Sequence, residues 1–503
     1  MTQGSARIPA TVITGFLGAG KTTVIRNLLA RAGGKRIALI INEFGDVGVD
    51  GEVLKGCGQE TCTEDDIVEL ANGCICCTVA DDFIPTMTKL LERDAKPDHI
   101  VIETSGLALP QPLVKAFNWP EIRNRVTVDG VVTVVDSAAV AGGRFAYVGP
   151  DAAHCVGEET QVIEADGRYL IPGLCDGHMH IESGMLTVSQ FVRAVIPHGT
   201  TSMFVDPHEV ANVLGLRGVR LMHDEALAQP VNVFVQMPSC APSSPGLETT
   251  GAELGPEEVA EAMTWPNIIG LGEMMNFPGV IAADPKMLGE IAATQAAGKT
   301  VGGHYASPDL SGFHAYAAGG PADDHEGTRE EDAIMRVRQG MRAMLRLGSA
   351  WYDVKAQITA VTEKGLDPRN FILCTDDCHS GTLVNDGHMN RVVRHAIDCG
   401  LDPLVALQMA TINTASHFGL ERELGSITPG RRADAILSSD LRSLPIEMVI
   451  ARGRIVARNG ELTAPEPDFE WPEDARGTVH LGRTLTPGDF DIRADAARVR
   501  ARV

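Results

Sequence analysis

Residues 172–185 of this 503-residue chain read PGLCDGHMHIESGM, a stretch that leads into the pair His178 and His180. The stretch predicts a β-strand, and side chains two positions apart on a strand point in the same direction. Two imidazoles directed at one point form half of a metal site. Two polar residues in a loop are the alternative. The metal interpretation therefore requires further ligands elsewhere in the chain.

The composition indicates a globular protein of about three domains. Lys and Arg number 43 against 66 Asp and Glu, and the resulting net charge of -23 repels nucleic acids and anionic membranes. The first residues lack the pattern of a signal peptide, and no run is apolar enough to span a bilayer. We expect a cytoplasmic protein without nucleic-acid or membrane partners, whose 11 cysteines are reduced or bind metal. Homo-oligomer formation stays open.

A phosphate-binding motif follows the first predicted strand, at residues 10–14. It reads GFLGAGKTT over residues 15–23. Its glycines free backbone N–H groups to cradle phosphates, its lysine reaches the outer phosphates, and its threonine binds magnesium. The candidate nucleotide-binding residues are Gly15, Gly18, Gly20, Lys21, Thr22 and Thr23. Helical material separates further apolar runs and so predicts a parallel α/β sheet; the runs are residues 36–42, 99–104 and 128–136.

Two more features of the N-terminal part concern nucleotide and metal. Glu103 ends a predicted strand, where its carboxylate could order magnesium and water beside a γ-phosphate. Three thiols crowd together as Cys74, Cys76 and Cys77. With the NEFG segment at 42–45, these features resemble the CobW-type P-loop GTPases, a family of metal-insertion proteins. The resemblance implies GTP with Mg²⁺ at the P-loop and a soft ion such as Zn²⁺ on the thiols, with an ion-free thiol cluster as the alternative.

The resemblance to these GTPases is partial. They read guanine with an Asn-Lys-x-Asp motif on a later strand, and no Asn-Lys pair occurs in this sequence. The resemblance covers roughly residues 1–143 and then stops in the middle of the predicted sheet. We therefore expect phosphate binding without assured guanine selectivity.

After residue 171, strand-like segments alternate with helices, and metal-binding or acidic side chains follow the strands. These segments are residues 200–205, 231–236, 268–272, 300–303 and 371–375. Polar chemistry at the carboxyl ends of successive strands is typical of a (β/α)₈ barrel. The predicted fold class is therefore α/β, with a partial P-loop parallel sheet followed by a metal-dependent barrel.

The side chains at these strand ends supply imidazoles and carboxylates for one or two divalent ions. The candidate metal ligands are His178, His180, Glu273, His304, His325 and Asp376. A carboxylate can bridge two ions, and a divalent ion lowers the pKa of its bound water toward about 7. Asp376 could accept the proton of that water and pass it to a leaving group.

Six stretches resemble the amidohydrolase superfamily and, within it, closely the bacterial adenine deaminases: PGLCDGHMHIESGM, DPHEVANVLG, GLGEMMNFPGVI, GMRAMLRLGSA, CTDD and TASHFGL. The resemblance runs from about residue 147 onward. It implies that a metal-bound hydroxide converts the small-molecule substrate adenine to hypoxanthine and ammonia. The implied ion is Mn²⁺ or Fe²⁺, with Zn²⁺ as an alternative, and the implied ligands are the six named above.

The resemblance also suggests roles for individual residues. Asp376 and Glu273 are candidate catalytic residues, with His208 as a third. Asp206 and Glu209 are candidates for holding the purine ring. The group around His208 could instead hold a further ion or only complete a turn after a strand.

The domain boundaries follow from changes in sequence texture. We predict a partial P-loop GTPase domain at 1–143, a junction with small-sheet strands at 144–170, a barrel at 171–424, and returning β-sandwich strands with a tail at 425–503. Short strands are expected in the last part at residues 425–430, 433–437, 448–451 and 454–456. In amidohydrolases such strands join others that precede the barrel, and most of those are absent here, so the sandwich is expected to be incomplete.

Three functional hypotheses remain from the sequence. The first is an adenine deaminase whose N-terminal part is a passenger. In the second, the thiol site loads metal into the barrel, driven by nucleotide. The third is a recombined or truncated chain in which neither part is active.

Overall fold

The computed structural model describes residues 7–14, 25, 28–29, 32, 35–42, 67–70, 83–93, 96–103, 116–117, 119–120, 122–133, 137–149, 152–465, 467 and 469–491. Outside these ranges lie the predicted phosphate-binding residues Gly15, Gly18, Gly20, Lys21, Thr22 and Thr23, and the thiols Cys74, Cys76 and Cys77. Glu103 and every predicted barrel residue lie inside them. Among the described helices, none has the length and apolarity needed to cross a bilayer.

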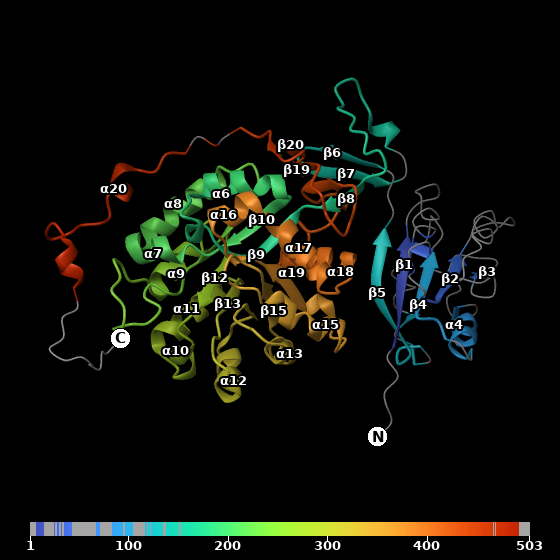
Figure 1. The fold of residues 1–503 in the computed structure, drawn as a ribbon, viewed down its shortest axis with the longest axis horizontal. Helices are drawn as coiled ribbons and strands as arrows, with labels where there is room; N and C mark the ends of the chain where they lie inside the picture. The colour runs from blue at the N-terminus through green and yellow to red at the C-terminus, as the bar shows by residue number, and fades with distance from the viewer. Residues whose placement is uncertain are drawn as a thin grey trace.

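The N-terminal part forms a parallel sheet, as predicted (Figure 1). Its strands are β1 (Ile8–Thr14), β2 (Ile37–Asn42), β3 (Ile67–Leu70), β4 (His99–Glu103) and β5 (Val126–Thr133), in the order β3-β2-β4-β1-β5. Alternate residues of β2 enter two different cores, Ala38 and Ile40 on one face and Ile37 and Leu39 on the other. Helix α4 (Ile84–Leu91) contributes Met87 to the first core. Burial on both faces explains why these strands read as continuous apolar runs.

A hairpin connects this sheet to the C-terminal part of the chain. Strands β6 (Ser137–Ala141) and β7 (Arg144–Gly149) are joined by Gly142 and Gly143, both with positive φ, as a tight two-residue turn requires. The Phe145 N–H donates to the Arg431 carbonyl at 2.9 Å. The hairpin thus lies against residues close to the C-terminal sheet.

The C-terminal sheet is antiparallel and has the order β21-β20-β19-β18-β8. Its strands are β8 (Tyr169–Pro172), β18 (Ala435–Ser438), β19 (Met448–Ala451), β20 (Arg454–Arg458) and β21 (Glu461–Leu462). The strand predicted at 425–430 is wrong, because that segment forms turns in which Gly425 and Gly430 have φ of 81° and 88°. Such positive φ values belong to the left-handed region of backbone conformation, whereas strand residues have strongly negative φ. The tail beyond this sheet carries the short elements α20 (Glu473–Arg476) and η7 (Pro487–Phe490).

Eight parallel strands form the barrel, within a stretch that is described throughout. They are β9 (Leu174–His180), β10 (Thr200–Val205), β11 (Asn232–Met237), β12 (Ile268–Met274), β13 (Thr300–Gly303), β14 (Asp323–Asp324), β15 (Arg342–Arg346) and β16 (Phe371–Cys374). The short β17 (Asp376–Asp377) continues β16 and pairs with β9, so the last strand returns beside the first. Between the two hydrogen-bonded ladders, the Ala322 N–H donates to the Val301 carbonyl at 2.9 Å.

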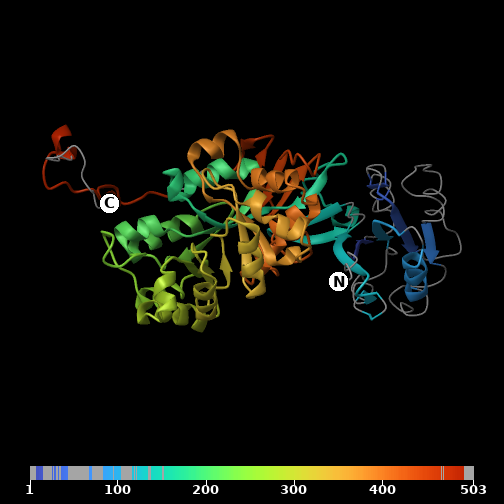
Figure 2. The same cartoon turned by 60° about the horizontal axis from the view of Figure 1, so that its bottom comes forward.

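Helices surround these strands (Figures 1 and 2). They are α6 (Val188–Val195), α7 (His208–Leu214), α8 (Leu216–Leu227), α9 (Pro256–Ala262), α10 (Phe277–Ile281), α11 (Pro285–Ala296), α12 (Leu310–Gly319), α13 (Glu330–Arg338), α14 (Val354–Gln357), α15 (Thr359–Thr362), α16 (Ser380–Asn385), α17 (Met389–Asp398), α18 (Pro403–Met409) and α19 (Ile412–His417). A separate buried cluster contains Phe204, Phe234 and Phe418, whose rings stack at centroid distances of 5.1 and 4.1 Å. This packed interior leaves the carboxyl ends of the strands as the place for polar chemistry.

Candidate metal centre

The first barrel strand delivers two imidazoles. His178 and His180 lie at the end of β9, both buried, with ring centroids 4.8 Å apart. The His180 Nδ1 donates to the Asp206 carbonyl at 2.8 Å. A carbonyl oxygen can only accept, so Nδ1 carries the hydrogen and Nε2 faces the centre of the site. That Nε2 lies 3.4 Å from Glu273 Oε1 and 3.4 Å from Asp376 Oδ1.

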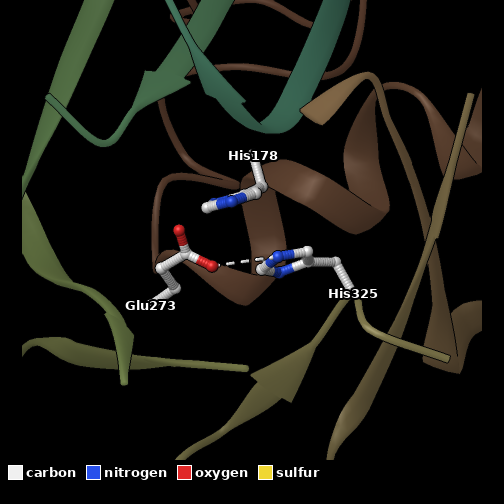
Figure 3. Close-up of side chains that lie close together, drawn as sticks. All are labelled: His178, Glu273 and His325. Carbon is white, nitrogen blue, oxygen red and sulfur yellow. Dashed lines mark ion pairs between the residues drawn. The ribbon is translucent and has the colours of Figure 1, made fainter. Parts of the chain in front are cut away.

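Glu273 is the centre of the cluster, near the end of β12 (Figure 3). Its Oε1 lies 3.0 Å from His208 Nδ1, and its Oε2 lies 3.1 Å from His325 Nε2. His304 Nδ1 makes a further hydrogen bond to Oε2. Burial alone would raise the pKa of Glu273, yet the facing imidazoles, led by His304, lower it well below its ordinary value. The carboxylate is therefore charged and lies between two groups of histidines.

The later strands add a second group. His304 follows β13 and His325 follows β14, and the His325 ring stacks on His178 at 4.1 Å between centroids. Glu326 Oε1 lies 3.7 Å from His304 Nδ1 and 3.6 Å from His325 Nε2. Burial opposes a charged imidazole, but the hydrogen bond to Glu273 and the nearby carboxylates raise the pKa of His325 to about 9.

Asp376 completes the site from the last strand. Its φ of 62° is a rare backbone conformation for a residue other than glycine and is typical of functional positions. The Asp176 carboxylate accepts hydrogen bonds from the backbone N–H of Thr375, at 3.0 Å, and from its hydroxyl, at 2.5 Å. Burial would raise the pKa of Asp376, but the hydrogen bond from His180 and the other imidazoles lower it. The carboxylate is thus held in its charged form.

Comparison with known proteins assigns a family to the part of the chain that contains this site. Residues 169–456 match the amidohydrolase family. This chain belongs to the amidohydrolase family. Residues 9–167 match the nucleotide-binding domain of the CobW/HypB/UreG family.

Several curated relatives of this amidohydrolase are named adenine deaminase. The protein of Ruegeria pomeroyi is 71% identical over 80% of this chain and 67% of its own length, and that of Ruegeria sp. strain TM1040 is 71% identical over 78% and 65%. The Moorella thermoacetica protein is 53% identical over 73% of this chain and 61% of its own. The chain thus spans about two thirds of the length of these relatives. Among solved structures, the D-hydantoinase of Thermus sp. covers 65% of this chain and 93% of its own at 14% identity, with a TM-score of 0.48.

The amidohydrolase family implies a divalent metal, and the residues present fit one. His178 Nε2 is buried and has no hydrogen-bond partner among the described residues. Burial, together with His325 and His180, lowers the pKa of His178, so its ring is neutral and can ligate. Two anionic carboxylates, those of Glu273 and Asp376, face the same space. Metal binding displaces the proton of a charged imidazole such as that of His325, and imidazoles and carboxylates together are suitable ligands for Zn²⁺, Mn²⁺ or Fe²⁺.

The structure brings together all six residues predicted as metal ligands in the barrel: His178, His180, Glu273, His304, His325 and Asp376. His208, predicted as catalytic, lies beside Glu273 at the first residue of α7. Asp206 lies behind the cluster, where its Oδ2 accepts the backbone N–H of Glu273 at 2.9 Å. Burial raises the pKa of this Asp206 carboxyl to about 6. Glu209 is more exposed and lies 3.5 Å from His208.

Two residues near the centre were not predicted. Glu326 directly follows His325, and its place after a strand-end histidine was a usable signal. Arg346 ends β15 and contacts both Glu326 and Asp376. It lies in the stretch GMRAMLRLGSA that carries the family resemblance, but the stretch alone does not indicate its role, because its partners come from other strands. Glu103, predicted near a nucleotide, ends β4 in the N-terminal sheet, where its side chain is buried.

Proposed function

We propose that this amidohydrolase removes the amino group of adenine by hydrolysis, giving hypoxanthine and ammonia. The observation that carries the proposal is the position of Glu273, in contact with imidazoles from the first barrel strand and from the end of the sixth. The names of the curated relatives support adenine as the small-molecule substrate. Because the chain spans about two thirds of their length, the activity has to be tested on this chain itself.

Two overlapping groups of side chains would hold the metal. His178, His180 and Asp376 form one, and Glu273, His178 and His325 form another. We propose that His304 joins the second group and that Glu273 belongs to both. A divalent ion in such a site supplies water that loses its proton near neutral pH. We assign Mn²⁺ or Fe²⁺ before Zn²⁺, since two carboxylates among the ligands favour borderline-hard ions.

Asp376 would accept a proton and His208 would donate one during the reaction. Asp376 Oδ2 is occupied by Arg346, at 2.9 Å, so Oδ1 is the oxygen that can accept a proton. Its lowered pKa keeps it deprotonated before the reaction. His208 begins α7, and its side chain is 17% exposed, against 4% and 3% for His178 and His180 on β9. We propose that it orients or protonates the departing amino group and that Glu209 contacts the purine, whereas Asp206, predicted for the same contact, is buried behind Glu273.

The test uses the full chain loaded with Mn²⁺ and incubated with adenine. We expect hypoxanthine and ammonia in equal amounts, and we expect His178→Ala to lose both turnover and metal. His314→Ala is the matched control, since that histidine is exposed on α12. Metal-loaded wild-type protein that leaves adenine unchanged would overturn the proposal.

A second candidate function rests on the match of residues 9–167 to a nucleotide-binding domain. In it, GTP with Mg²⁺ at the predicted P-loop would drive transfer of an ion such as Zn²⁺ from the predicted thiols to the barrel. Lys21→Ala tests this candidate. Reduced metal occupancy of the barrel when GTP is present would support it, and unchanged occupancy would exclude it.

A further inference from the structure

Arg346 is the one guanidinium among the described residues that contacts Asp376. It is the last residue of β15, and its side chain is 2% exposed. Nη1 lies 2.9 Å from Asp376 Oδ2, and the guanidinium also bonds both oxygens of Glu326, one of them at 3.2 Å. Nε donates to Asp353 Oδ2 at 2.6 Å, and the Trp351 ring lies 4.8 Å from the guanidinium carbon. Four side chains therefore fix its position.

These contacts connect the two groups of the metal centre. Asp376 belongs to the group of the first strand, and Glu326 belongs to the group of His304 and His325. A planar guanidinium can bond two carboxylates in a fixed geometry, which a lysine ammonium cannot do. Arg346 thus separates two negative charges that would otherwise repel each other at the centre.

The backbone of Asp376 is already fixed by another contact. Its left-handed φ and the bonds from Thr375 to Asp176 determine where the carboxylate begins. Rotation of the side chain remains, and Arg346 restricts it by holding Oδ2. Oδ1 is then left 3.4 Å from His180 Nε2 and 3.9 Å from His178 Nε2.

We propose that Arg346 is a positioning residue, which turns one oxygen of Asp376 toward the His178 and His180 pair and holds Glu326 beside the later histidines. The inference rests on the proposed function for its effect on catalysis. Its effect on metal binding is independent of the substrate. Residues that orient metal ligands typically change metal affinity or activity about 10- to 100-fold when replaced.

The experiment compares Arg346→Met and Arg346→Lys with Arg342→Met. Arg342 begins the same strand and bonds the Arg369 carbonyl and Asn370, away from the metal centre. Each full-length variant is titrated with Mn²⁺ alone and then assayed with adenine. We expect Arg346→Met to lower Mn²⁺ affinity or kcat by about 10- to 100-fold, with KM nearly unchanged. Arg346→Lys should recover part of the loss, because it restores the charge and not the fork.

The outcomes separate the two claims. If wild-type protein binds Mn²⁺ but does not deaminate adenine, the proposed function fails and the Mn²⁺ titration alone decides the role of Arg346. Mn²⁺ affinity in Arg346→Met equal to that in Arg342→Met, together with equal kcat where the enzyme is active, would overturn the positioning role. If Arg346→Met does not fold, the same comparison is made with Arg346→Lys, and an unchanged kcat and affinity there would overturn it equally.

Discussion

The mouth of the barrel and the layer of helices around it each bury a glutamate, with opposite electrostatic results. Glu273 at the mouth is 3% exposed and Glu290 on α11 is 0% exposed. Imidazoles surround the first, and its pKa is lowered well below the ordinary value against the effect of burial. Glu290 has an ion pair with Lys286, with 3.6 Å between Oε1 and Nζ. Neither of its oxygens makes a hydrogen bond in the part of the chain that is described.

Burial therefore raises the pKa of Glu290 to about 8. The difference between the two glutamates lies in their neighbours, since both have lost their contact with water. A buried carboxylate that stays charged needs several hydrogen-bond donors, and such a group is suited to a metal ion. A buried carboxyl group without hydrogen-bond donors takes up a proton instead, and its burial lowers the stability of the fold at neutral pH.

The largest effect is expected from Glu273→Gln. The amide removes the charge that faces His180, His208 and His325, so metal binding should be lost and kcat should fall by about 1000-fold or more. Glu290→Gln is the matched control, and it should keep the wild-type kcat. Metal analysis and the adenine assay check both variants. A Glu273→Gln protein that still binds metal as the wild type does would break the comparison.

A third buried carboxylate, Asp176, allows a test of whether the hydrogen bonds from Thr375 position Asp376. Asp176→Asn weakens the bonds to Thr375 that place Asp376, and kcat should fall about 10- to 100-fold. Asp434→Asn serves as control, because this buried carboxylate bonds Asn232 and Arg452, near the amino end of β11. Steady-state kinetics distinguish them. Equal kcat in both variants would mean that Asp176 does not position Asp376.

Glu290 predicts a pH dependence of stability. Its folded pKa of about 8 lies above the ordinary 4.5, so the folded state binds the proton more tightly than the unfolded state. The contribution of Glu290 to the free energy of unfolding is therefore fully present below pH 4.5 and is lost as pH rises through about 8. The loss amounts to at most about 1.4 kcal/mol per pH unit. Denaturant unfolding at several pH values should show this slope in the wild type and a smaller slope in Glu290→Gln. Equal slopes would refute the assignment.

The smallest effect is expected from a glutamate whose side chain is about one third exposed. Glu423 is 34% exposed and pairs with Arg144 of β7 at 2.7 Å. Water screens this pair, so Glu423→Gln should change the free energy of unfolding by less than about 1 kcal/mol at any pH from 6 to 9. Denaturant unfolding measures it. A loss of several kcal/mol would show that solvent exposure does not make the ion pair of Glu423 weak.

Most barrel strands could be predicted because their composition is decisive. The predicted segments at 200–205 and 300–303, each beginning with β-branched residues, coincide with β10 and β13. The run at 231–236 is displaced from β11 by one residue. In contrast, β15 reads RAMLR, which contains no β-branched residue and is flanked by charges, so it was not predicted. Its strand conformation comes from pairing with β14 and β16.

The same distinction holds for the metal centre. Residues at strand ends could be predicted to meet, since parallel strands bring their carboxyl ends to one edge, and all six candidates do lie together. Their roles as ligands stay a prediction. Arg346 could not be found in this way, because its importance depends on Glu326 and Asp376 lying on either side of it. The domain boundaries at 143, 170 and 424 also stay predictions.

The most direct measurement is anomalous diffraction at the manganese absorption edge, from crystals of the full chain grown with Mn²⁺. We predict an anomalous peak in contact with Glu273 and with ring nitrogens of His178 and His325, where Figure 3 shows the three side chains close together. A protein that binds Mn²⁺ in solution and shows no peak at Glu273 would contradict the assignment of this cluster as a metal centre.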